Sequence, residues 1–109
     1  MVDEPIAVIV RKYLNNLNQQ GLPVAYGVVF GSQARGAASQ WSDIDLLVIS
    51  NRFDEEPLRE DINLLWRVAA HTDSRIEPIP VGERQFLTDD SRAIIEIARR
   101  EGQVIPLID

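Results

Sequence analysis

Two aspartates, Asp43 and Asp45, stand one residue apart at the start of an apolar run. Because side chains alternate along a strand, a strand here would place both carboxylates on one face. Like charges held so close raise the pKa of at least one carboxyl group unless a cation lies between them. The alternative without a function is a strand end whose carboxylates only contact solvent. We favour the first interpretation, which predicts a divalent metal site.

A Gly31-Ser32 pair ends the preceding apolar run and marks a turn. Residues 32–38 are compatible with a short helix, weakened by Gly36, whose first backbone N–H groups would cluster beside Ser32. If the protein binds phosphates, such N–H groups and a metal at the carboxylates would both serve without a basic surface.

Hydrophobic periodicity predicts the elements that position these residues. Pro57 is expected to open the third helix and residues 71–73 to close it. Residues 85–87 are interpreted as a short connector. The helices are predicted over residues 5–20, 32–38, 57–73 and 91–101, and the strands over residues 24–30, 43–50, 75–81 and a final edge segment, 104–108.

The third predicted strand, residues 75–81, carries a further carboxylate. Alternation places Glu77 on one face with two apolar residues, the pattern that also follows Asp45. Both strands are therefore expected to present this face to the same core. Pro78 and Pro80 cannot donate to a ladder, which predicts an edge strand or outward positions that need no partner.

Composition predicts one compact domain over residues 1–109, with 45% apolar and 26% charged residues. The net charge of −6 and the pI of about 4.7 argue against nucleic acid or an anionic membrane as a partner. The chain has no cysteine, its apolar runs are too short to span a bilayer, and its start is acidic. A cytoplasmic protein is expected.

These motifs resemble a family. A Gly-Ser turn after the first strand, Asp-x-Asp entering the second and an acidic residue in the third resemble the nucleotidyltransferase superfamily that includes polymerase-β-like palms. The segments Ala34-Arg35-Gly36 and Ser42-Asp43 make the chain most similar to minimal nucleotidyltransferase (MNT) domains, often paired with HEPN-domain toxins. The resemblance covers nearly the whole chain. It implies an α+β fold, with a small mixed β-sheet flanked by helices.

The resemblance also implies roles for the acidic residues. Nucleotide transfer needs in-line attack at the α-phosphorus of ATP, with two Mg²⁺ ions stabilising the attacking and leaving oxygens. Asp43 and Asp45 would bind these metals. Glu77 would be the third carboxylate, binding one metal and orienting or deprotonating the acceptor hydroxyl. Many relatives carry aspartate at this position, and glutamate moves the carboxylate outward by one methylene.

The nucleotide side of the site would use four residues. Gly31 would let the backbone approach the triphosphate, and Ser32 with neighbouring N–H groups would hold its terminal phosphates. Arg35 and Ser42 are further candidates for nucleotide binding. A structural salt bridge is an equally good interpretation of Arg35.

Three other residues have plainer interpretations. Trp41 could stack on a base, but we expect it to close the loop before Asp43. Trp66 is expected in the core, on a helix stripe with Leu58, Ile62, Leu65 and Ala69. His71, at a helix end, is expected to supply only a favourable charge there.

Three functions remain open at this stage. The first is AMP transfer from ATP to a hydroxyl of a partner protein, such as a HEPN toxin, because 109 residues leave no length for an acceptor domain. The second is an antitoxin that masks its partner by binding, without chemistry. The third is transfer to a small molecule such as an aminoglycoside, in a pocket that a homo-oligomer would build between subunits.

Overall fold

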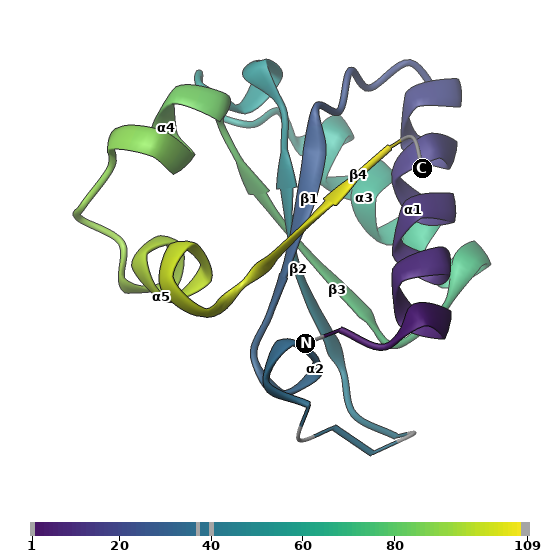
Figure 1. The fold of residues 1–109 in the computed structure, drawn as a ribbon. Helices are drawn as coiled ribbons and strands as arrows, with labels where there is room; N and C mark the ends of the chain where they lie inside the picture. Colours follow the sequence, from purple (N-terminus) through teal and green to yellow (C-terminus); the bar gives the residue numbers. More distant parts are fainter. Residues whose placement is uncertain (1, 37, 40, 108–109) are drawn as a thin grey trace.

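A computed structural model describes residues 2–36, 38–39 and 41–107 and places a single sheet between two helical layers (Figure 1). The sheet has four strands in the order β3-β2-β1-β4. In chain order the elements are α1 (Glu4–Gln19), β1 (Tyr26–Phe30), α2 (Ser32–Arg35), β2 (Ile44–Ile49), the 3₁₀ helix η1 (Asn51–Phe53), α3 (Arg59–Thr72), β3 (Ile76–Val81), α4 (Glu83–Thr88), α5 (Ala93–Glu101) and β4 (Gln103–Pro106).

The sheet is mixed. Strand β1 pairs antiparallel with β2 and β4, whereas β2 and β3 run parallel and are connected by the crossover helix α3. This confirms the predicted α+β class and a mixed sheet flanked by helices. It also confirms that β3 and the final strand lie at the two edges of the sheet.

The hydrogen bonds of β3 explain how its prolines are tolerated. The backbone N–H of Ile44 donates to the carbonyl of Arg75, and that of Ser50 donates to the carbonyl of Val81, at 2.8 and 3.1 Å. Main-chain groups alternate in direction along a strand, so residues 75, 77, 79 and 81 point theirs at β2. Pro78 and Pro80 therefore occupy outward positions, where the missing N–H costs no ladder bond.

The two faces of the sheet carry separate cores. Helices α1 and α3 cover one face, and α4 and α5 cover the other (Figure 1). Leu47, Ile49 and Val81 belong to the core beneath α4 and α5. Asp45 and Glu77, which share the alternation of these residues, lie on that same face, as the sequence predicts.

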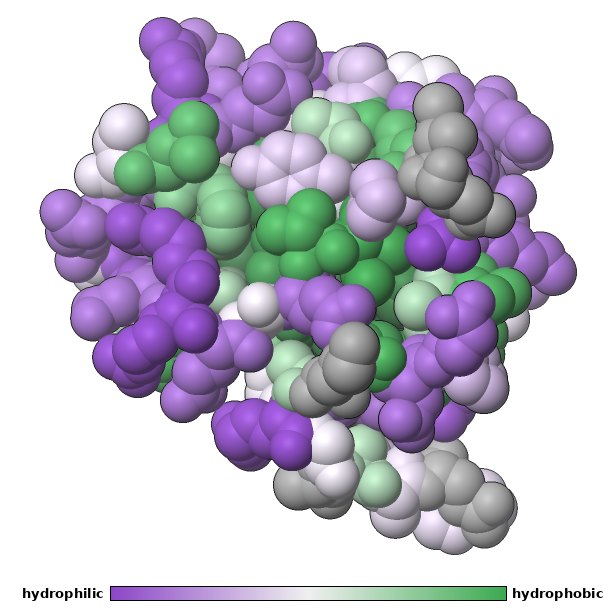
Figure 2. Space-filling view, viewed as in Figure 1, coloured by the Kyte–Doolittle hydropathy of each residue, from purple (hydrophilic) through white to green (hydrophobic). Residues whose placement is uncertain are grey.

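Figure 2 shows the side of the molecule on which β4 lies, with apolar side chains gathered near the middle and hydrophilic ones around them. Val104 of β4 is 54% exposed there. Within the described residues, no helix has the length and apolar character needed to cross a membrane.

Helix α3 differs from its prediction at both its start and its buried face. It begins at Arg59, because Pro57 and the extended Leu58 precede the helical turns. The expected core position of Trp66 is wrong, since this side chain is 50% exposed, as Leu58 is at 54%. The inward face instead carries Asp61, Leu64, Leu65, Val68 and Ala69. Because Asp61 is polar, the hydrophobic pattern does not identify this face as the buried one.

Residues 85–87 are helical, so the predicted connector is wrong. Helix α4 is capped by Asp54, a residue about thirty positions earlier, whose Oδ1 accepts from the backbone N–H groups of Arg84 and Gln85 at 3.1 and 3.3 Å. The Gln85 side chain in turn accepts from the N–H of Gly82 at 3.1 Å. A cap from another part of the chain leaves no local signal.

Helix α2 is shorter than predicted. It ends at Arg35, and Gly36 follows with a left-handed φ of 71°. Such a glycine is a common helix stop. Ala37, within the predicted helix over residues 32–38, and Ile108, at the end of the predicted strand over residues 104–108, lie outside the described residues.

The buried carboxylate of Asp61 predicts a stability effect. Its oxygens accept from Nε and Nη2 of Arg52 at 3.1 and 2.9 Å, and its side chain is only 5% exposed. Asp61→Ala leaves the guanidinium without this partner, so we expect a loss of about 1–3 kcal/mol in the free energy of unfolding. Urea unfolding measures it. The control Asp90→Ala removes an exposed pair with Arg99 and should cost about 0.5 kcal/mol or less; equal losses would contradict the prediction.

Candidate active site

The candidate site lies at the end of the sheet where β1 ends and β2 and β3 begin, close to α2 (Figure 1). In the strand register, Asp45 stands opposite Phe30 of β1 on one side and opposite Glu77 of β3 on the other. Gly31 follows Phe30 directly. The sheet therefore sets Gly31, Asp45 and Glu77 in a row across three strands, a juxtaposition that the sequence motifs alone do not fix.

Gly31 and Asp45 are in direct contact. A Cβ atom added to Gly31 would lie 2.5 Å from Oδ2 of Asp45, closer than real Cβ contacts allow. The φ of Gly31 is 73°, in the left-handed region that other residues adopt only with strain. Both observations require glycine here, and together they let the carboxylate of Asp45 rest against the turn after β1.

The carboxylates influence one another. Burial raises the pKa of Asp45, the charge of Asp43 raises it further, and the charge of Arg35 opposes this rise. Desolvation raises the pKa of Glu77, followed by the charges of Asp43 and Asp45 and a hydrogen bond with the Asp43 side chain. The repulsion predicted from spacing therefore acts on Asp45, and it extends to Glu77 on the next strand.

The residues predicted on the nucleotide side lie around α2. Ser32 is its first residue and partly buried, and the carbonyl of Gly31 accepts from the backbone N–H groups of Ala34 and Arg35 at 3.2 Å each. Arg35 is half exposed and forms an ion pair with Glu101 of α5, with 3.7 Å between Nη1 and Oε2. Its guanidinium therefore has a structural partner, and its charge also reaches Asp45.

Ser42 holds the loop before Asp43. Its hydroxyl accepts from the backbone N–H of Ser39 at 3.0 Å, and its carbonyl accepts from Nε2 of Gln33 at 3.3 Å. Gln33 is 5% exposed, and nothing in its sequence context marked it as a brace for this loop. Trp41 is 81% exposed, so the expectation that it closes the loop is wrong. The two serines close it.

The donor chemistry of the row fits a hard divalent cation, because carboxylate oxygens are the ligands that Mg²⁺ prefers. Among the residues that the structure describes, no group of three or more histidine, cysteine, aspartate or glutamate side chains forms a ready-made metal cage. Mg²⁺ does not require one, since it keeps several waters and shares phosphate oxygens of its substrate. Asp43 and Asp45 could therefore hold a metal that arrives with a nucleotide.

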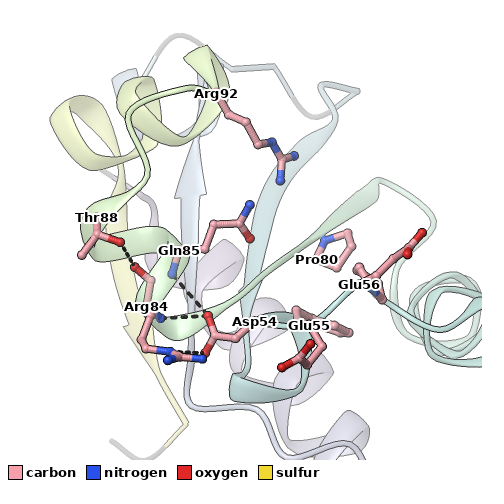
Figure 3. Close-up of a pocket in the computed structure, with 10 residues that line it drawn as sticks. Asp54, Glu55, Glu56, Pro80, Arg84, Gln85, Thr88 and Arg92 are labelled. Atoms are coloured by element: carbon pink, nitrogen blue, oxygen red, sulfur yellow. Dashed lines mark hydrogen bonds and ion pairs between the residues drawn. The ribbon is translucent and has the colours of Figure 1, made fainter.

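A hollow lies beside the last part of β3, away from the row of Gly31, Asp45 and Glu77 (Figure 3). It has a volume of about 540 Å³ and lies between η1, the segment that follows it, Pro80 and α4. Asp54 faces Arg84 and Gln85 within it, as the cap of α4 requires (Figure 3). The Asp54 carboxylate in this hollow therefore has a structural role as the cap of α4. None of the predicted site residues lines the hollow.

The role of Glu77 as the third carboxylate of the site can be tested by substitution. Glu77→Gln keeps the size of the side chain and removes its charge, and we expect AMP transfer to fall about 10²-fold if this group holds the acceptor proton. Glu77→Asp should retain more activity than Glu77→Gln. Initial rates at saturating ATP measure both. Glu96→Gln, on the exposed side of α5, is the control, and a loss no larger than that of the control would remove Glu77 from the site.

A mixed sheet with a glycine turn and carboxylates on neighbouring strand starts defines a protein of the nucleotidyl-transfer class. Residues 10–102 match the nucleotidyltransferase domain family, and the chain belongs to this family. A search among curated proteins gives no match.

Two solved structures share the fold. A candidate nucleotidyltransferase from Sulfolobus solfataricus is 15% identical, with a TM-score of 0.64 over 90% of this chain and 77% of that one. A toxin-antitoxin with AMP-PNP is 18% identical, with a TM-score of 0.60 over 87% of this chain and 71% of that one. At these identities the likeness establishes the fold alone. The match over residues 10–102 confirms the family predicted from the motifs.

Proposed function

We propose that this protein is a metal-dependent nucleotidyltransferase that moves AMP from ATP to a hydroxyl group of a partner toxin, and so acts as an antitoxin. The observation that carries the proposal is the row of Gly31, Asp45 and Glu77, with Asp43 beside it, at one end of the sheet. Membership of the nucleotidyltransferase domain family supports the reaction class.

In the proposed reaction the acceptor oxygen attacks the α-phosphorus of ATP. The new oxygen–phosphorus bond forms as the bond from the α-phosphorus to the bridging oxygen breaks, and pyrophosphate leaves. Glu77 accepts the acceptor proton. Two Mg²⁺ ions held by Asp43 and Asp45, one of them also by Glu77, would neutralise the charge that develops on the attacking and leaving oxygens.

The remaining residues position the nucleotide. Gly31 has no side chain, which allows the carboxylate of Asp45 to lie against the turn. The backbone N–H groups beside Ser32 would hold the phosphates. Arg35 would exchange Glu101 for a phosphate oxygen, because their contact is long and exposed and therefore weak. Ser42 would act by holding Asp43 in place through the loop, rather than by touching the nucleotide.

A toxin as acceptor is supported by the toxin-antitoxin whose structure with AMP-PNP shares this fold. That likeness leaves the identity of the toxin open, and we propose a HEPN-domain protein with a tyrosine hydroxyl as acceptor. The open edge beside β3 supports a macromolecular acceptor, since Glu77 lies on an edge strand and is itself exposed.

The experiment is mass spectrometry of the protein encoded by the neighbouring gene after incubation with this chain and Mg-ATP. We expect the added mass of one or more AMP groups on a hydroxyl side chain, and none when EDTA replaces Mg²⁺. Neutralisation of the toxin without any added mass would overturn the proposal.

A further inference from the structure

Trp41 is the most exposed large apolar side chain among the described residues, at 81%. It lies two positions before Asp43, on the loop that joins α2 to β2. A tryptophan in water leaves a large apolar area unburied, which is costly to keep and typical of contact sites. The second tryptophan, Trp66, is 50% exposed on α3 and offers a natural comparison.

The described residues Ser39, Trp41 and Ser42 of this loop are linked by hydrogen bonds. The backbone N–H of Trp41 donates to Oγ of Ser39 at 3.3 Å, and that of Ser42 donates to the carbonyl of Ser39 at 3.1 Å. Gln33 fastens the same loop to α2 through Ser42. The chain therefore presents the indole from a braced turn, which lowers the entropy cost of using it in binding.

Resting on the function proposed above, we infer that Trp41 is a contact residue for the acceptor protein and that the toxin covers this loop when its hydroxyl enters the site. The loop lies at the end of the sheet where β2 begins (Figure 1), and Trp41 is two residues before Asp43. An acceptor hydroxyl that is part of a protein brings a surface with it to Asp43. Trp41, two positions away and 81% exposed, is a large apolar side chain available to that surface.

A hollow on the other side of the loop favours a protein over a nucleotide base. It has a volume of about 290 Å³ and is lined by Ala38 and Ser39 of the loop and by Ile6 and Ile9 of α1, among others. Helix α1 covers the face of the sheet opposite to Asp45. The hollow includes Ala38 and Ser39 of the loop that carries Trp41, so a protein surface that covers Trp41 can extend into the hollow as well.

The test compares Trp41→Ala with Trp66→Ala. Calorimetry measures the affinity of each variant for the toxin encoded by the neighbouring gene, and steady-state kinetics gives KM for that toxin and for ATP separately. The variant Trp66→Phe leaves Trp41 as the only tryptophan of this chain, so its emission during titration with Mg-ATP reports stacking on the base.

We expect Trp41→Ala to weaken toxin binding and to raise KM for the toxin about tenfold, a typical loss for an aromatic contact. KM for ATP should not change in Trp41→Ala, and Mg-ATP should not change the emission of Trp41 in Trp66→Phe. Trp66→Ala should bind the toxin as the parent chain does. An unchanged affinity for the toxin would overturn the inference. So would quenching by Mg-ATP with a raised KM for ATP, which would assign Trp41 to the base.

These outcomes are separate from the proposed reaction. If the parent chain binds the toxin but transfers no AMP, the proposed enzyme function fails, while calorimetry still decides whether Trp41 contacts the toxin. If AMP is transferred and Trp41→Ala binds the toxin as tightly as Trp66→Ala does, only the inference fails.

Discussion

The double substitution Asp43→Asn with Asp45→Asn is expected to lower AMP transfer about 10³-fold or more and to leave the fold intact. Removing charges that act as one unit in catalysis has effects of this size. Asn keeps the shape of both side chains, and neither residue belongs to the two cores. Initial rates of AMP incorporation at saturating Mg-ATP measure the loss. Asp90→Asn, whose side chain is 89% exposed, is the control.

Stability provides an independent measurement on the same variant. The pKa of Asp45 is raised in the folded protein, so its ionised form is less favourable there than in the unfolded chain. Above the folded-state pKa this disfavours folding, and the disadvantage shrinks as the pH falls through that pKa. Without metal at neutral pH, the double variant should therefore unfold at a temperature no lower than the parent does. A large fall would show that the carboxylates serve structure.

The double variant also separates AMP transfer to the toxin from antitoxin action by binding alone. An antitoxin that acts by transferring AMP loses neutralisation with the two aspartates, because the toxin is no longer modified. An antitoxin that acts by binding alone keeps it. Growth of cells that express the toxin with either version of this chain distinguishes the two, and undiminished protection by the double variant would reject the enzymatic role.

Gly31→Ala is the second substitution with a large expected effect. The added methyl group would lie 2.5 Å from Oδ2 of Asp45, so the carboxylate or the turn must move. A displacement of about 1 Å in a catalytic group can cost about 10²-fold in rate. We expect a loss of that order in AMP transfer, with a larger effect on kcat than on the affinity for the toxin.

Gly21→Ala is a matched control for backbone strain. Gly21 also has a positive φ, 95°, but a Cβ atom there would meet nothing within 4 Å. Gly21→Ala should lose about 1–2 kcal/mol of stability from its positive φ. Gly31→Ala should lose about 1–3 kcal/mol, because φ 73° with ψ −150° is a conformation almost restricted to glycine. Thermal or urea unfolding measures both. Only Gly31→Ala should lose activity beyond that. Equal activity in the two variants would mean that the contact between Gly31 and Asp45 has no catalytic importance.

Strand alternation and turn residues predict most of the candidate site, because the Gly-Ser turn and the Asp-x-Asp spacing are visible in the sequence itself. Alternation placed Asp45 and Glu77 on the face of one core, and their pairing in register supports that reasoning. The direct contact of Gly31 with Asp45 was beyond prediction. It depends on how β1 and β2 align, which is decided by packing across the whole sheet rather than by neighbours in sequence.

The errors have a common origin in long-range partners. Residues 85–87 form a helix because Asp54 caps it, and Asp61 sits on the buried face of α3 because Arg52 pairs with it. The hydrophobic pattern treats Asp61 as polar and exposed and therefore places the apolar stripe through Trp66. Trp41 is expected to close the loop, whereas Ser39 and Ser42 do so through hydrogen bonds.

The outward prolines of β3 limit how any partner can approach the acceptor side of the site. A free strand edge usually invites another chain to extend the sheet through main-chain hydrogen bonds. Pro78 and Pro80 offer no donors at two consecutive outward positions, so strand addition at this edge would lose the hydrogen bonds that those N–H groups would donate. We therefore expect a toxin that docks beside Glu77 to be recognised mainly through side chains, and the same two residues disfavour edge-to-edge aggregation at that place.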